Sequence, residues 1–458
     1  MVTELEVQEF GAALRGALIA PGDDDYDKAR SLYNAMIDKH PALIAQCRDV
    51  ADVISAVNFG RTHNLEVAIR SGGHNGPGLG SVDGGLVIDL SQMKGIRVDP
   101  GTSTVRVEGG CTWGDVDHAT HAFGLAVPTG IISTTGVGGL TLGGGMGYLT
   151  RGHGLTIDNL LGADVVLADG RLVTASAEEN ADLFWALRGG GGNFGVVTSF
   201  LYQCQPVSTV YGGPIFWPLE YAGKVMSMWK EIILSDQQDL SGFFAFHIVP
   251  PGAPFPEEHH LKNMCAVVWC YTGDLANADK VFEPIRAVAP AAIDFCGPIP
   301  LPALNSMFDP VYTPGLQWYW KADFFNELNQ EAMALNIQHG SQLPTVHSAT
   351  HIFPINGKAH RVGQNDTPWS YREANFSQVI VGVSPDPADN ERTIKWSNDY
   401  WNDLHPHSSG GAYLNMMMEE GQERVQTAYR DNYPRLAQIK TKYDPENFFH
   451  VNQNIHPG

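Results

Sequence analysis

The sequence predicts an α+β protein in which a glycine-rich domain is joined to a second domain, an antiparallel sheet covered by helices. Three observations predict this fold class. At about 150 residues per domain, a chain of 458 residues is long enough for two or three domains. Glycine is abundant, with 50 residues, and it clusters between residues 72 and 195. Near Pro206 these clusters stop, and prolines and aromatic residues become more frequent.

The first region, up to about residue 208, alternates helical and strand-like patterns. Apolar residues recur at helical spacing in VADVISAVNFGRTHN, and LEVAIRSGG predicts a strand that runs into a glycine loop. Short strands are expected in GGLVIDLSQM and STVRVEGGC, and a helix from Thr112 to Gly124. The Asp169-Gly170 pair predicts the turn of a hairpin. A helix in NADLFWALRGG and a strand in FGVVTSFLYQC complete the region.

The second region, from about 209 to 414, predicts an antiparallel sheet covered by helices. Strands are expected in MCAVVWCYTG, GLQWYWKADFF, VHSATHIFPI and FSQVIVGVS. Helices are expected near 220–235, 275–289, 327–339 and 389–404. The last stretch predicts a helix, a turn at Asp444-Pro445 and a polar tail.

Charge and cysteine content restrict the classes of partner. The formal net charge of −21 disfavours nucleic acid and anionic membrane surfaces, because phosphates are bound by Lys and Arg. No apolar run reaches 18 residues, and the N-terminus lacks the basic start and apolar core of a signal peptide. The six cysteines include no CxxC pair, so neither zinc nor a redox dithiol is indicated. A cytoplasmic protein with reduced thiols is expected.

The GGGGNFG segment at 189–195 matches the spacing of a dinucleotide-binding fingerprint, with Gly190, Gly192 and Gly195 at its glycine positions. That fingerprint needs a strand before it and a helix after it, whereas here a helix precedes and a strand follows. The alternative is a turn where two elements pack closely. No GxxxxGK[ST] motif is present, which excludes a P-loop.

Two other glycine stretches favour a large ligand. In RSGGHNGPGLG a strand ends at Arg70, and the small residues after it expose backbone N–H groups that can hold a pyrophosphate. The longer stretch at 127–160 has too few apolar side chains for a core of its own, which is understandable if it wraps a large flat ligand. The alternative for either stretch alone is a flexible loop.

Five segments together resemble a known family, the FAD-linked oxidases of the berberine bridge enzyme type, which have the vanillyl-alcohol-oxidase flavoprotein fold. They are RSGGHN, GGCTWGDV, TGVGGLTLGGGMGYLTRGHGLTIDNLLGADVVLADG, LFWALRGGGGNFGVVTSF and YDPENFFHVNQNI. The resemblance is most specific in 66–200 and 440–455, and it is nearest to the bacterial branch that includes 6-hydroxy-D-nicotine oxidase.

The resemblance implies a two-part FAD-binding domain, formed by 1–208 and 415–458, with a substrate-binding domain at 209–414 between the parts. It implies that the histidine of SGGH, here His74, is bonded to the 8α-methyl of FAD. It also places the pyrophosphate on the 70–75 loop, the flavin ring against 128–145 and 192–197, and the tail asparagines at the flavin edge. The cofactor-binding residues expected on this basis are Arg70, Ser71, Gly72, Gly73, His74, Asn75, Pro128, Thr129, Gly130, Thr135, Gly136, Gly139, Gly143, Gly144, Gly145, Asn159, Gly192, Gly195, Val197, Asn452 and Asn454.

Some members of this family carry a second bond, from a cysteine to the flavin 6-position. The matching position here is Ile132, and Cys111 lies upstream, where it is expected to pack as a small apolar residue. A single covalent link, from His74, is therefore expected.

The acid–base group is predicted in GGAYLNMM, which resembles the family strand that presents a tyrosine and an asparagine over the flavin. Tyr413 is the candidate base, and Asn415 the group that positions substrate or flavin. A tyrosine, with a pKa near ~10, needs that pKa lowered to act as a base at neutral pH, which a nearby cation or oxidised flavin would do. The alternative is a buried core tyrosine.

The substrate-domain strands offer further candidates. His347, Ala349 and His351 share one face by the period of two, and Gln378 lies on another strand. Each of them can instead pair with solvent or a neighbour. No clear carboxylate accompanies them. The histidine pairs at 259–260 and 405–407 lack an acidic residue at ligand spacing, so no metal is expected.

The reaction predicted is that of an oxidase. A C–H bond next to oxygen or nitrogen, in an alcohol, sugar hemiacetal or amine, gives hydride to the flavin, and O2 reoxidises it to form hydrogen peroxide. One alternative keeps the fold but excludes oxygen, giving a dehydrogenase. The other is a non-catalytic protein that binds flavin or a metabolite.

Overall fold

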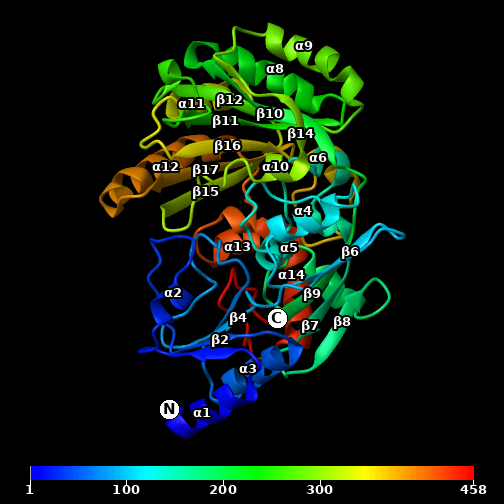
Figure 1. Cartoon of the computed structure of the whole chain (residues 1–458), viewed down its shortest axis with the longest axis vertical. Helices are drawn as coiled ribbons and strands as arrows, with labels where there is room; N and C mark the ends of the chain where they lie inside the picture. The colour runs from blue at the N-terminus through cyan, green and yellow to red at the C-terminus, as the bar shows by residue number, and fades with distance from the viewer. Residues whose placement is uncertain (1) are drawn as a thin grey trace.

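The structure is a computed structural model that describes residues 2–458. Figure 1 shows a large sheet with its helices at one end of the long axis and two smaller sheets with their helices toward the other. This is the α+β class predicted, and the composition change near Pro206 coincides with the passage from the small sheets to the large one.

The first small sheet has the order β1-β2-β4-β3, in which β2, β4 and β3 run parallel and β1 is an antiparallel edge. The strands are β1 (Ala17–Ile19), β2 (Leu43–Gln46), β3 (Val67–Arg70) and β4 (Leu86–Asp89). Helix α3 (Val50–Thr62) covers it as predicted, and Asp49 caps the helix by accepting from the N–H groups of Ala51 and Asp52. Helices α1 (Glu4–Ala13) and α2 (Tyr26–Arg30) complete this part.

The second small sheet is antiparallel, in the order β5-β6-β9-β7-β8. Its strands are β5 (Ile96–Asp99), β6 (Thr104–Glu108), β7 (Leu160–Val166), β8 (Leu172–Ser176) and β9 (Val196–Gln203). The hairpin predicted at Asp169-Gly170 is confirmed between β7 and β8, and Gly170 has φ +84°, the left-handed backbone that this turn requires. Four helices accompany the sheet: α4 (Trp113–His121), α5 (Val137–Gly143), α6 (Thr150–His153) and α7 (Ala181–Leu187).

The large sheet has the order β13-β10-β12-β11-β16-β17-β15, with β14 also paired to β10. Its strands are β10 (Thr209–Pro218), β11 (Leu240–Ile248), β12 (Asn263–Tyr271), β13 (Ile293–Asp294), β14 (Gly297–Pro300), β15 (Gln317–Phe325), β16 (Ala349–Pro354) and β17 (Phe376–Ser384). All its pairings are antiparallel, and the four predicted helices are confirmed. They are α8 (Ala222–Leu234), α9 (Ala278–Ala287), α11 (Gln330–Gly340) and α12 (Asn390–Leu404), beside the short α10 (Leu301–Asn305).

The two faces of the large sheet pack against different parts of the protein. Side chains of one parity, such as Phe244, Ile352 and Ile380, pack with the covering helices. Those of the other parity, such as Phe353 and Val379, face the glycine-rich half of the chain. The sheet is therefore buried on both sides, and only the second face can contribute to a site shared with the small sheets.

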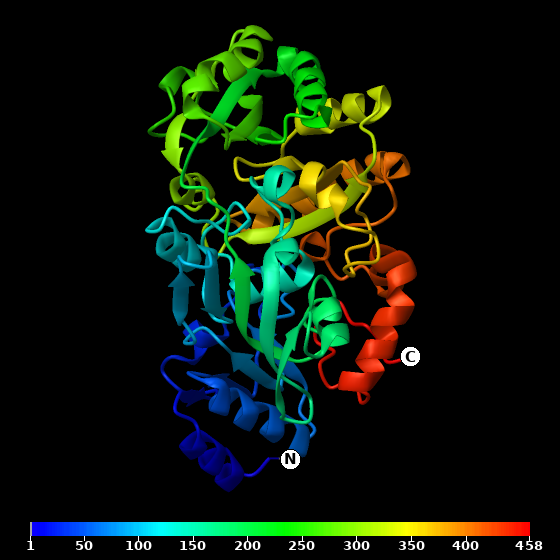
Figure 2. The ribbon, with the colours of Figure 1, turned by 90° about the vertical axis from the view of Figure 1, so that its right-hand side faces the viewer.

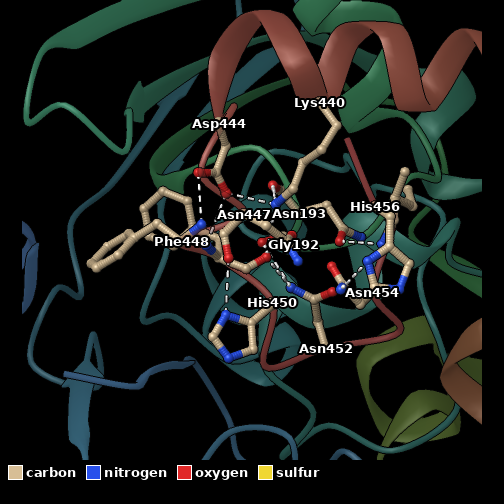
Figure 3. A network of polar contacts seen from close by, with 12 residues as sticks. Gly192, Asn193, Lys440, Asp444, Asn447, Phe448, His450, Asn452, Asn454 and His456 are labelled. Carbon is tan, nitrogen blue, oxygen red and sulfur yellow. Dashed lines mark hydrogen bonds and ion pairs between the residues drawn. The ribbon is translucent and has the colours of Figure 1, made fainter. Parts of the chain in front are cut away.

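The end of the chain returns to the small-sheet half through α13 (Gln422–Tyr429) and α14 (Tyr433–Tyr443) (Figure 2). Helix α14 packs on α7, and the tail after it runs beside the 189–195 loop. Figure 3 shows why the tail is held there: the Lys440 ammonium donates to the carbonyls of Asn193 and Phe449 and to the Asp444 carboxylate. These bonds fix the tail against the glycine loop.

Candidate active site

A cavity of about 340 Å³ lies between the glycine-rich half and the large sheet. The segments that sequence motifs singled out separately meet in its wall. The predicted site residues that line it are Arg70, Ser71, Gly72, Gly73, His74, Asn75, Gly130, Thr135, Gly136, Gly139, Gly143, Gly192, Gly195, Val197, His351, Tyr413, Asn415 and Asn452.

The 70–75 loop continues from the end of β3 and lies in the cavity wall. The Arg70 guanidinium donates to the Asp89 carboxylate at 2.9 Å, and its other terminal nitrogen, Nη1, is buried without a partner among the described residues. A Cβ at Gly72 would lie 2.3 Å from the backbone nitrogen of Gly136, so only glycine allows the two glycine stretches to touch. The backbone itself is thereby left at the cavity surface.

His74 is half-buried, and its imidazole ring contacts Tyr33 and Thr134. The ring stacks on Tyr33, with centroids 3.8 Å apart and planes at 19°. Its Nε2 lies 3.1 Å from the Thr134 hydroxyl, while Nδ1 has no hydrogen-bond partner among residues 2–458. Burial lowers the pKa of the imidazole to about 4, so the ring is neutral at pH 7 and Nδ1 is available as a nucleophile.

Helix α5 supplies a glycine surface opposite this loop. A Cβ at Gly139 would meet no atom within 4 Å, whereas one at Gly143 would lie 2.3 Å from Oδ1 of Asn415. Gly139 therefore opens onto the cavity, and Gly143 allows Asn415 to lie against the helix. Gly192, in the 189–195 loop, has the same open surroundings as Gly139.

Tyr413 and Asn415 come from the segment after the large sheet and form one hydrogen-bonded unit. The Tyr413 hydroxyl accepts from the Gly145 N–H at 3.0 Å and from the Asn415 side-chain amide at 2.8 Å. Burial raises the pKa of this hydroxyl to about 12, although both hydrogen bonds act to lower it. The lowered pKa that a base needs is therefore not supplied by the chain's own residues.

The large sheet contributes an aromatic and aliphatic wall. The residues it adds to the cavity include Trp318, Trp320, Phe353, Val379 and Val381. The sequence predicts a strand in GLQWYWKADFF, and the structure places its two tryptophans, Trp318 and Trp320, in the cavity wall. The alternation along β15 and β17 was the signal that could have found them.

His351 lies in this wall and is hydrogen-bonded to a histidine that sequence reasoning missed. Its Nε2 is 2.9 Å from Nε2 of His247 on β11, and both rings are buried. Burial lowers the pKa of His247 to about 4, and burial together with the neighbouring His247 lowers that of His351 well below its usual value. Both imidazoles are therefore neutral at pH 7.

The prediction that Gln378 belongs to the site is wrong. Its side chain lies on the helix-facing side of β17, where it donates to Asn336, Thr350 and Tyr400. The neighbouring Val379 takes the cavity-facing position, because successive strand residues alternate between faces. His347 also lies outside the cavity wall, with its Nδ1 3.2 Å from the carbonyl oxygen of Val311.

Six predicted cofactor-binding residues do not line the cavity and support its wall from behind. The Asn159 amide donates to the carbonyls of His153 and Leu155, and the Pro128 carbonyl accepts from the Thr156 hydroxyl. The Asn454 side-chain nitrogen lies 3.5 Å from Nδ1 of His456 within the tail (Figure 3). The expectation of direct contact is corrected for these residues: Pro128, Thr129, Gly144, Gly145, Asn159 and Asn454.

The cavity has the features that a dinucleotide with a flat ring needs. Glycine backbone without side chains faces the cavity from three segments. A ligand can therefore lie close to the main chain, for example at the Arg70 loop and at Gly139. Unpartnered buried polar atoms, Arg70 Nη1 and Asn452 Oδ1, provide a donor and an acceptor. Ile132, the position that the family resemblance matches to the second cysteine link, lines the cavity, and the Cys111 side chain is buried. The residues present therefore fit FAD.

Comparison with known proteins identifies the class of protein to which the chain belongs. The family model described as "FAD binding domain" matches residues 41–176, and the one described as "Berberine and berberine like" matches 412–456. An FAD-linked oxidoreductase of Dictyostelium discoideum is 32% identical over 455 residues, covering 98% of this chain and 97% of the relative. The (R)-6-hydroxynicotine oxidase of Paenarthrobacter nicotinovorans is 30% identical, covering 97% of each.

A solved structure has the same fold. The crystal structure of 6-hydroxy-D-nicotine oxidase from Arthrobacter nicotinovorans aligns with a TM-score of 0.85 at 27% identity, covering 97% of this chain and 98% of that one. The fold and cavity thus define an FAD-dependent oxidoreductase. The chain belongs to the berberine bridge enzyme-like FAD-linked oxidoreductases, as the sequence resemblance predicted.

Two features of the described part of the chain concern other classes of protein. Among residues 2–458 no group of three or more His, Cys, Asp or Glu side chains is placed to hold a metal ion. None of the helices described combines the length and apolar character needed to cross a membrane.

Proposed function

We propose that the protein is an oxidase of a small organic substrate, with FAD attached by a single covalent bond to His74. The observation that carries the attachment is the state of His74: a neutral ring, held at Nε2 by Thr134 and stacked on Tyr33, with Nδ1 free. A glucooligosaccharide oxidase structure of the same fold is described as carrying an 8α-N1-histidyl FAD together with a 6-S-cysteinyl bond. Ile132 provides no second thiol.

The pyrophosphate is assigned to the backbone N–H groups of 71–75, and the flavin ring to the surface made by Gly136, Gly139 and Gly192. Asn452 faces the ring from the tail. On this assignment residues 1–208 and 415–458 form the FAD-binding domain, and 209–414 form the substrate-binding domain. The cavity between them receives both cofactor and substrate.

Bound FAD supplies a two-electron acceptor that takes hydride from a C–H bond next to oxygen or nitrogen and is reoxidised by O2 to give hydrogen peroxide. The chain itself handles the proton. As the phenolate, Tyr413 takes the O–H or N–H proton of the substrate and becomes the hydroxyl, and the Gly145 N–H and Asn415 amide stabilise the negative charge that its oxygen carries before the transfer.

The test uses the purified protein. After acid precipitation the yellow colour should stay in the pellet, and His74→Ala should release it to the supernatant. Photoreduced protein mixed with air should then reoxidise within seconds and form hydrogen peroxide. Colour in the wild-type supernatant rejects the covalent bond, and reduced flavin that persists in air identifies a dehydrogenase instead.

A further inference from the structure

We propose that the substrate end of the cavity is built for a neutral, planar aromatic molecule, and that the His351–His247 pair is its hydrogen-bonding anchor. This inference rests on the proposed function, since it names the substrate class of that same site.

The first observation is the charge of the wall. Among the described residues that line the cavity, Arg70 is the one side chain with a full charge, and it is paired with Asp89 at the 70–75 loop. No Asp, Glu or Lys of residues 2–458 lines the cavity. An ammonium or carboxylate on the substrate would lose its hydration without gaining an opposite charge, which is a large cost.

The second observation is the shape and chemistry of the large-sheet wall. Trp318, Trp320 and Phe353 offer ring surfaces, and Val379 and Val381 fill the space between them. Trp318 and Trp320 lie edge to face, with centroids 5.9 Å apart and planes at 85°. Aromatic rings pack well on such surfaces, whereas a sugar brings hydroxyl groups that each need a partner.

The third observation is the histidine pair, which is polar and yet enclosed by rings. Phe243 lies 4.9 Å from the His351 ring centroid and Phe353 lies 5.8 Å from it. The contact between the two Nε2 atoms needs one proton, so one ring donates and the other accepts. His351 Nδ1 has no protein partner among residues 2–458, and it is the atom left to bond a hydroxyl or carbonyl of the ligand.

These observations distinguish His351 from Tyr413. Tyr413 and Asn415 lie against the glycine surface assigned to the flavin, whereas His351 lies on the sheet opposite. His351 is therefore a positioning residue that orients the aromatic molecule, and His247 fixes the tautomer of its ring.

The experiment titrates the FAD-loaded protein under argon with three probes: 4-methoxybenzyl alcohol, benzylamine and cellobiose. Binding is measured by the change in flavin absorbance and by calorimetry, and turnover by bleaching. 4-Methoxybenzyl alcohol should bind about tenfold more tightly than either other probe, a difference of about 1.4 kcal/mol, since burying an unpaired charge or hydroxyl is unfavourable.

Variants separate the two parts of the proposal. His351→Leu should weaken binding of 4-methoxybenzyl alcohol about fivefold to tenfold, the range for one lost hydrogen bond, while His351→Gln restores much of it. His347→Leu, which removes a histidine outside the cavity wall, is the matched control and should bind as the parent does. Val379→Glu should reverse the preference toward benzylamine.

Tighter binding of cellobiose or benzylamine by the parent, or no binding of any probe, overturns the aromatic assignment. Equal binding by His351→Leu and the parent overturns the anchor. Each of these results is obtained on yellow protein that reoxidises in air, so the proposed oxidase function would still stand. Protein without flavin rejects the proposed function instead.

Discussion

The Lys440 ammonium lies 2.6 Å from the Asp444 carboxylate, and both side chains are fully buried (Figure 3). The ion pair joins α14 to the tail, because Asp444 also accepts from the N–H groups of Phe448 and Phe449. Burial lowers the pKa of Lys440, while Asp444 acts to raise it. Removing either partner leaves an unpaired charge in the protein interior.

Lys440→Met is therefore expected to lower the free energy of unfolding by about 3–5 kcal/mol, the range for breaking a buried pair. The value is measured by urea denaturation. Lys442→Met is the control, because that lysine is more than half exposed in its pair with Asp182 and should cost less than about 1 kcal/mol. Similar losses in both variants would show that the buried pair has no special role.

Gly139→Ala should impair cofactor binding without harming the fold. The added Cβ meets no protein atom within 4 Å and lies in a helix, where alanine is favoured by about 1 kcal/mol. It does enter the surface assigned to the flavin. We expect a lower flavin content, measured by absorbance, with an unchanged or raised melting temperature.

Gly223→Ala in α8 is the matched control. Its Cβ would make an ordinary contact of 3.8 Å with Ile337, far from the cavity wall. It should keep full flavin content. If Gly139→Ala also binds flavin normally, α5 does not touch the ring.

Tyr413→Phe is expected to lower kcat by about 10²–10⁴-fold, the usual contribution of a positioned acid–base group. Burial raises the pKa of this hydroxyl to about 12, so the phenolate fraction grows as the pH rises toward that value. The kcat of the parent should accordingly increase from neutral to alkaline pH, and the variant should lose that dependence. Steady-state oxygen consumption measures both.

The control is Tyr148→Phe, which removes a buried hydroxyl that has no partner among the described residues. Its kcat and pH profile should match those of the parent. A Tyr413→Phe variant with the parent's pH profile would assign the proton transfer to another group.

Asp117 should make stability decrease as pH rises. Its carboxyl is buried and accepts a hydrogen bond from Asn305 at 2.8 Å, across the contact of α4 and α10. Burial raises its pKa from 3.8 to about 7. The unfolded chain therefore loses this proton first, and the free energy of unfolding falls between about pH 4 and pH 7 and levels off above.

Asp117→Asn removes the ionisation, so it should be more stable than the parent by at least about 1 kcal/mol at pH 8 and similar at pH 4. Asp279→Asn, at a carboxylate that is 95% exposed, is the control and should follow the parent at both pH values. Parallel curves for parent and Asp117→Asn would show that Asp117 does not ionise in this range.

Much of this site could be predicted because its parts are carried by local patterns. The strand-to-glycine-loop transition at Arg70 and the α3 and α7 helices follow from short-range periodicity and turn chemistry. Tyr413 and His74 followed from motifs of the family. Each of these features depends on residues close together in the chain.

The remainder depends on contacts that no local pattern contains. The His247–His351 pair exists because β11 and β16 are neighbours in register, although the residues are 104 positions apart. Gln378 and Val379 lie in the same predicted strand, and the sequence does not show which of these two side chains points toward the helices. The packing of α11 and α12 on the sheet decides this. The i,i+4 spacing of Lys440 and Asp444 was visible, but their burial was not.

Peptide mass spectrometry is the most direct test of the proposed bond between His74 and FAD. Trypsin cleavage after Arg70 and Lys94 isolates SGGHNGPGLGSVDGGLVIDLSQMK, in which His74 is the single histidine. From yellow protein this peptide should carry the added mass of FAD less two hydrogens, with fragment ions that place it on the imidazole. An unmodified peptide recovered in full from yellow protein would show that His74 is not bonded to FAD.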